Sequence, residues 1–138
     1  MGLIEVVIAM FLTTVGVLAL LSLQPSGWRA MARSDYLGRA SGILYKTLED
    51  QETLILNPCN AVTIGTTTAT VQVSGQTAVI SGDVTYTVNT TIAQDGANAQ
   101  AFVVTVTVTW PTNATGMSES LAVTRQELYR FPTGCANA

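Results

Sequence analysis

The chain lacks histidine altogether, and only 11% of its 138 residues are charged. Histidine is the commonest general base and metal ligand near neutral pH, so its absence removes the side chain most used for proton transfer and metal binding. The Gly-x-Ser-x-Gly motif that presents a nucleophilic serine is also missing. We therefore expect no enzymatic activity, no catalytic residue, no metal site and no cofactor.

Basic residues are scarce, and after Lys46 the remaining ones are Arg125 and Arg130. The formal net charge is −3, and no cluster of lysine or arginine is present that could follow a phosphate backbone. Nucleic-acid binding is therefore not predicted. The acids Asp83 and Asp95 each adjoin a turn glycine, where capping or solvation is expected rather than metal binding.

A long apolar run dominates the start of the chain. Val6 to Leu23 carries no charge, and as a helix it is long enough to cross the ~30 Å hydrocarbon core of a bilayer. Glu5 stands at its beginning, where an isolated carboxylate costs about 2.5–3.5 kcal/mol on insertion scales. We expect an α-amino group to neutralise it: that of Met1 in the same chain, or that of Met1 in a neighbouring copy.

Two other classes of N-terminal segment also contain an apolar run. A secretory signal peptide has basic residues before a core of about 7–15 residues and small residues after it. Here nothing basic precedes the core, the core is longer, and Leu23-Gln24-Pro25 is a poor cleavage site. A plain membrane anchor would insert more readily without Glu5.

Met1 to Leu23 resembles the N-terminus of mature type IV pilins and pseudopilins, which carry glutamate at the fifth position. With Met1 as the first mature residue, Glu5 stands at that position, while Gly2 departs mildly from the family pattern. The resemblance implies that Met1 is exposed by leader removal and N-methylated, and that Met1 and Glu5 form an assembly site. A more diffuse likeness, to minor pilins of the PilV type, extends to Leu56.

The apolar run is predicted to continue into an amphipathic helix over residues 28–56, which Asn57-Pro58 ends. Gly16, Pro25 and Gly27 predict a kink or a short melted stretch, because proline removes a backbone donor and glycine adds backbone freedom. Spacings of three, four and seven residues predict a stripe that packs on a sheet. This stripe comprises Leu37, Ala40, Leu44, Leu48 and Ile55.

Beyond Cys59 the pattern changes to the period of two that is typical of strands. The predicted strands are Thr70–Val73, Ala78–Ile80, Val84–Thr91, Ala101–Trp110 and Ser120–Arg125. Short connections favour sequential antiparallel pairing. We predict an α+β fold with a membrane and assembly helix (1–27) and a globular domain (28–138), whose antiparallel sheet spans 60–131. A long N-terminal helix on such a sheet is also what the pilin resemblance implies.

The two cysteines, Cys59 and Cys135, match no metal-binding spacing. In an exported domain we expect a disulfide that closes a long loop and contributes about 4 kcal/mol. The pilin resemblance implies the same, since many type IV pilins have a disulfide in their C-terminal region. The alternative is a pair of buried free thiols.

The leading interpretation is a structural subunit of a type IV pilus, located in the bacterial inner membrane before assembly and in an extracellular filament afterwards. The expected partners are further copies of the chain, membrane lipid, the pilus assembly machinery and the prepilin peptidase. Two alternatives stay open. One is a low-copy minor pilin or a pseudopilin of type II secretion, and the other is a monomeric membrane-anchored binding module.

Overall fold

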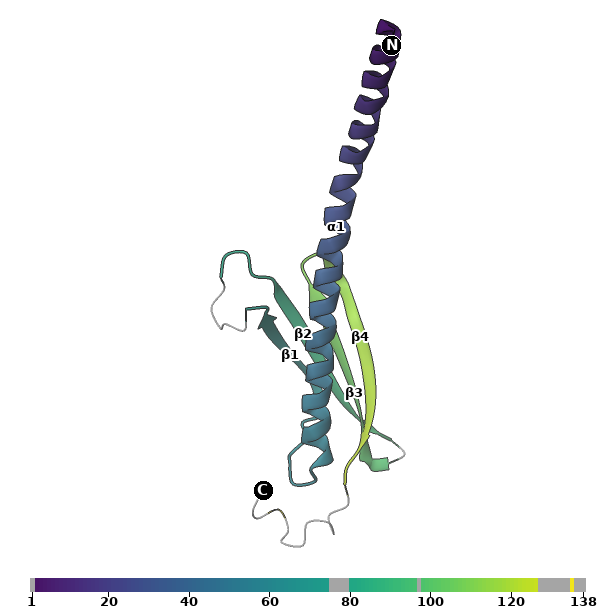
Figure 1. Cartoon of the computed structure of the whole chain (residues 1–138). Helices are drawn as coiled ribbons and strands as arrows, with labels where there is room; N and C mark the ends of the chain where they lie inside the picture. Colours follow the sequence, from purple (N-terminus) through teal and green to yellow (C-terminus); the bar gives the residue numbers. More distant parts are fainter. Residues whose placement is uncertain (1, 75–79, 97, 127–134, 136–138) are drawn as a thin grey trace. The chain divides into compact units, whose positions relative to one another are not determined.

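A computed structural model describes residues 2–74, 80–96, 98–126 and 135, and it confirms the predicted α+β class. The elements are α1 (Leu3–Leu56), β1 (Gly65–Gln72), β2 (Thr85–Asp95), β3 (Asn98–Trp110) and β4 (Asn113–Thr124) (Figure 1). The chain divides into two compact units, Met1–Leu37 and Gly38–Ala138. The second unit holds the whole sheet and the part of α1 that packs on it.

Helix α1 is continuous at the three residues that were predicted to interrupt it. Gly16, Pro25 and Gly27 all lie inside continuous helix, and the melted stretch expected there is not present in this chain. A single proline removes one backbone donor, and the turns around it still supply their own hydrogen bonds. A kink at these positions, or melting within an assembly, stays a prediction.

The four strands form one sheet in the order β1-β2-β3-β4, with every neighbouring pair antiparallel. The predicted sequential pairing is therefore confirmed. On the face towards the helix, Ala69 pairs with Val88, and Val88 pairs with Val108. On the opposite face, paired residues of neighbouring strands carry hydroxyl groups. The Thr105 and Ser120 hydroxyls, for example, form a hydrogen bond of 2.8 Å.

The core lies between the second half of α1 and the central strands. Buried helix residues are Ala40, Leu44, Leu48 and Ile55, and the buried apolar residues of the sheet are Tyr86, Val88, Ile92, Phe102, Val104, Val106, Val108, Trp110 and Val123. Leu37 was predicted to belong to the helix stripe, but it is 45% exposed. It precedes Ala40, the first buried helix residue, so helical period alone extended the stripe one turn too far.

The outer strands begin earlier than predicted. β1 starts at Gly65 rather than Thr70, and β4 starts at Asn113 rather than Ser120. Their first residues are largely exposed on both faces, so no apolar alternation marks them in the sequence. Of the strand predicted at Ala78–Ile80, Ile80 lies outside any strand, and the other two residues lie outside the described part of the chain.

The residues that follow α1 are linked to the residues that follow β4 by a disulfide and a hydrogen bond. Cys59 and Cys135 form the predicted disulfide, with Cα atoms 5.0 Å apart and 76 residues of separation. Closing a loop of that length contributes about 4.5 kcal/mol in the chain-entropy model. The Arg125 guanidinium donates a hydrogen bond of 2.6 Å to the Asn60 carbonyl, and it lies 5.3 Å from the centroid of the Phe102 ring.

The Asp83 carboxylate, just before β2, accepts two hydrogen bonds from Ser74. The backbone N–H of Ser74 donates to Asp83 Oδ2 at 3.3 Å, and the Ser74 hydroxyl donates to the same oxygen. The hydroxyl bond is the main reason that the pKa of the Asp83 carboxyl lies below its ordinary value of 3.8. Asp83 therefore caps a turn, as expected from the sequence.

Candidate assembly site

Glu5 lies in the first turn of α1. Its backbone N–H donates to the Gly2 carbonyl at 3.0 Å, and a carboxylate in a first turn interacts favourably with the unpaired N–H groups there. The next charged residue is Arg29, about 36 Å further along the helix at 1.5 Å per residue. No side chain of this helix segment can therefore neutralise Glu5. Met1 lies outside the described residues, so its predicted pairing with Glu5 stays a prediction.

The segment that follows Glu5 exposes almost all of its apolar side chains. The large ones that are exposed between Leu3 and Leu23 number fourteen: Leu3, Ile4, Val6, Val7, Ile8, Met10, Phe11, Leu12, Val15, Val17, Leu18, Leu20, Leu21 and Leu23. At about 1.5–3 kcal/mol each, their removal from water stabilises by roughly 20–40 kcal/mol. The cost of about 2.5–3.5 kcal/mol for Glu5 is far smaller. The segment therefore belongs in an apolar environment.

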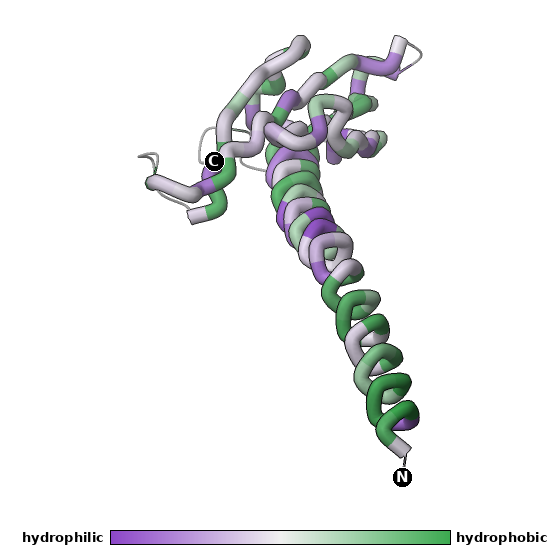
Figure 2. The backbone as a smooth tube through the Cα atoms, turned by 90° about the horizontal axis from the view of Figure 1, so that it is seen from above, coloured by the Kyte–Doolittle hydropathy of each residue, from purple (hydrophilic) through white to green (hydrophobic). Residues whose placement is uncertain are grey.

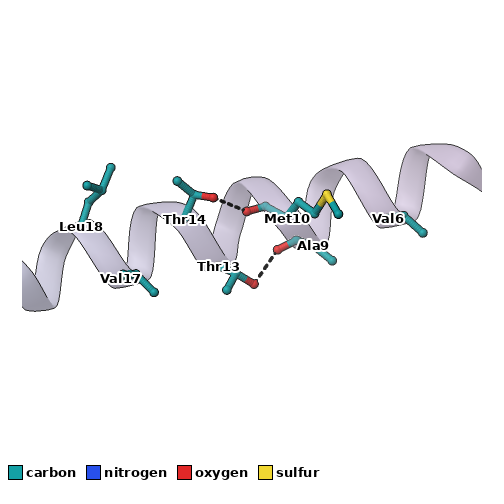
Figure 3. A pocket seen from close by; sticks show the side chains of 7 residues that line it. All are labelled: Val6, Ala9, Met10, Thr13, Thr14, Val17 and Leu18. Carbon is teal, nitrogen blue, oxygen red and sulfur yellow. Dashed lines mark hydrogen bonds between the residues drawn. The ribbon is translucent and has the colours of Figure 1, made fainter.

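In length and composition, this part of α1 is able to cross a membrane. Figure 2 shows it coloured as hydrophobic over most of its turns. Its hydroxyl groups need no water, because the Thr13 hydroxyl donates to the Ala9 carbonyl at 2.7 Å and the Thr14 hydroxyl donates to the Met10 carbonyl at 2.8 Å (Figure 3). Polar groups satisfied within the helix are what lipid or a packed helix bundle requires.

A groove runs along one side of this segment. It is lined by Val6, Ala9, Met10, Thr13, Thr14, Val17 and Leu18 (Figure 3). These residues form two ladders at steps of four, and Ala9 with Thr13 makes one ladder narrow. Small residues four apart let a second helix approach closely in an apolar medium. Sequence reasoning missed this groove, although the spacing of Ala9 and Thr13 was the signal that would have revealed it.

Among the described residues, none of the other predicted site residues lines this groove, although Gly16 lies between Thr14 and Val17 in the same stretch of α1. Pro25 and Gly27 follow it along α1, and the disulfide partners Cys59 and Cys135 belong to the second unit. The site is thus one helix segment with a single charge at its beginning. It offers exposed apolar surface and one carboxylate.

No protein-family model matches the chain, and it matches no curated protein and no solved structure.

Proposed function

We propose that this chain is a structural subunit of a type IV pilus or a pilus-like filament and polymerises through its N-terminal helix. The observation that carries the proposal is the exposed apolar segment of α1 with Glu5 at its beginning. The architecture is pilin-like: a long N-terminal helix, apolar at its start, packs on a four-stranded antiparallel sheet with a C-terminal disulfide. That likeness supports the proposal.

The apolar segment first resides in lipid. When a subunit leaves the membrane, the same side chains still need an apolar environment, which only the helices of other copies supply. A central bundle of these helices follows, and the groove at Ala9 and Thr13 offers a surface for close helix packing. The roughly 20–40 kcal/mol of transfer free energy per subunit makes such a polymer hard to dissociate.

Glu5 gives the bundle its register. An amine placed 4 Å from a carboxylate gains about 4 kcal/mol at an effective dielectric constant of 20, which offsets the cost of taking the carboxylate into the bilayer. The Met1 amine of an adjacent subunit is the cation proposed for this role. A subunit shifted along the axis would lose that gain, so pairing selects one axial position.

The proposed location follows from both units. The helix suggests insertion into a membrane or secretion, and the disulfide fits a domain outside the cytoplasm. We place the subunit in the bacterial inner membrane before assembly and in an extracellular filament afterwards. The prepilin peptidase would expose and methylate Met1, and the inner-membrane machinery would add the subunit to the filament.

The test compares two single substitutions in cells that produce the full chain. Glu5→Ala leaves the protein in the membrane but reduces its amount in sheared filaments to background, because the pairing partner is lost. Glu49→Ala removes an exposed carboxylate from the later part of α1 and leaves the filament yield unchanged. Filaments are examined by electron microscopy and their composition by mass spectrometry. A normal yield with Glu5→Ala would contradict the proposed role of Glu5.

The composition of wild-type filaments separates the remaining interpretations. If the chain forms the bulk of the filament, it is a major pilin. If it is present only in traces, it is a minor pilin or a pseudopilin. If no filament forms and the chain stays monodisperse in the membrane, it is an anchored binding module.

A further inference from the structure

Strand β1 is the least covered element of the sheet. Its residues from Gly65 to Val71 are all exposed, and only Gln72 is half-buried. Ala69 and Val71 lie on the face that the helix covers elsewhere, since their partners Val88 and Tyr86 are buried. In Figure 1, β1 lies to one side of the helix, β2 and β3 cross behind it, and β4 lies on the other side. Among the residues that the structure describes, nothing covers β1 on either face or along its outer edge.

The outer edge of β1 also lacks the features that normally block strand pairing. Exposed edges are usually protected by charged residues, by proline or by a β-bulge. β1 contains no charged residue and no proline. Its pairing with β2 runs in unbroken register from Gly65 to Gln72, without a bulge. Its outward N–H and C=O groups can therefore accept a further strand.

The second free edge of the described sheet belongs to β4, because β2 and β3 each have a partner on both sides. Gly116 interrupts the start of β4, where the register with β3 shifts. From Met117 to Thr124 the pairing with β3 is regular. That regular part has the same length as β1, so the two free edges can pair along their full extent.

The direction of the strands decides which edges can meet. The sheet holds four strands that alternate in direction, so β1 and β4 are antiparallel. A copy displaced sideways without inversion therefore brings its β4 antiparallel to β1, which continues the alternation. Pairing of β1 with a second β1 in the antiparallel sense would invert one subunit, and a filament whose helices all enter the bundle in one direction excludes that.

We propose that, in the assembled filament, the outer edge of β1 pairs with the Met117–Thr124 edge of a second copy of this chain. This inference depends on the proposed function, which brings copies side by side in one direction. The contact is heterologous, so it propagates from subunit to subunit instead of closing a dimer. It links neighbouring domains by backbone hydrogen bonds and covers Ala69 and Val71.

The test measures amide hydrogen exchange in the full chain, as wild-type filaments and as detergent-solubilised monomers. In an edge strand alternate N–H groups face outward and exchange quickly. We expect alternate amides of β1 and of Met117–Thr124 to exchange at least about tenfold more slowly in filaments. The amides of β3, paired on both sides in the monomer, serve as the internal control. Filaments in which the β1 amides exchange as in the monomer would overturn the inference and leave the proposed function intact.

A pair of neighbouring proline substitutions supplies an independent readout. Of Thr68 and Ala69, one N–H bonds to β2 and the other faces outward, because these directions alternate along a strand. The outward position is the one at which proline leaves the Tm of the detergent-solubilised monomer unchanged. In filaments of that variant, the amides of Met117–Thr124 should lose their protection from hydrogen exchange, and the filament yield should fall. Unchanged exchange in filaments of that variant contradicts the inference. If the wild-type chain forms no filaments, the proposed function fails and this inference fails with it.

Discussion

Gly116 offers a sharp test of the sheet geometry. It lies at the start of β4 with a φ of 71°, and its N–H donates to Asn113 Oδ1 at 3.0 Å. A Cβ atom added at this position would lie 2.2 Å from the Val108 carbonyl oxygen and 2.7 Å from Thr109 Cγ2. The oxygen belongs to the backbone of a central strand, so it cannot rotate away. Gly116→Ala must therefore distort the β3–β4 ladder.

The expected loss has two parts. Alanine in the left-handed region costs about 1–2 kcal/mol. Moving β4 away from Val108 breaks at least one ladder hydrogen bond, which adds about 0.5–1.5 kcal/mol. The free energy of unfolding should fall by roughly 1.5–3.5 kcal/mol, which lowers the Tm of a domain of this size by about 7–17 °C.

Gly82→Ala is the matched control. Gly82 has a φ of 90°, but a Cβ there meets nothing within 4 Å, so only the conformational cost of about 1–2 kcal/mol applies. Thermal unfolding of both full-length variants in detergent can be followed by near-UV circular dichroism of buried Trp110. If Gly116→Ala is no more destabilising than Gly82→Ala, the close approach to Val108 is refuted.

Two further predictions concern the core and the turn. Leu44→Ala should lower the free energy of unfolding by about 2–5 kcal/mol in denaturant titration, because Leu44 is 2% exposed. Leu37→Ala, at an exposed position, should lower it by less than about 0.5 kcal/mol. Equal losses would contradict the burial stripe that begins at Ala40. Because the pKa of Asp83 is lowered, its stabilisation of the turn is complete above the unfolded pKa and is lost as the pH falls through the folded pKa, below 3.8. Hydrogen exchange of the Ser74 amide should therefore accelerate in acid beyond its intrinsic pH dependence. Asp83→Asn should abolish this acceleration. The same acceleration in the variant would refute the role of the Asp83 carboxylate in holding the turn.

The parts of the fold that follow from local pattern were predictable. The uncharged run from Val6 to Leu23 already required an apolar environment, and the pairing of Glu5 at its beginning stays a prediction. The alternation of Phe102, Val104 and Val106 predicted β3, because one face of that strand is buried. The Cys59–Cys135 bridge followed from having two cysteines in a domain expected to be exported.

The outer parts of the sheet and the details of the helix surface were not predictable in this way. β1 is exposed on both faces, so its threonines show no alternation, and only pairing with β2 makes it a strand. The exposure of Leu37 likewise depends on where the sheet lies, which helical period does not specify. The groove at Ala9 and Thr13 depends on the size of side chains, which apolar character alone does not specify.

The sequence by itself determined that the first helix segment must avoid water and that the alternating strand residues must be buried. These are properties of short stretches of chain, and solvation acts on them residue by residue. The tertiary structure alone decided which edges of the described sheet stay free and where a side chain fails to fit, as at β1 and at Gly116 against Val108. Those outcomes depend on contacts between residues distant in the chain, and such contacts leave no periodic trace in the sequence.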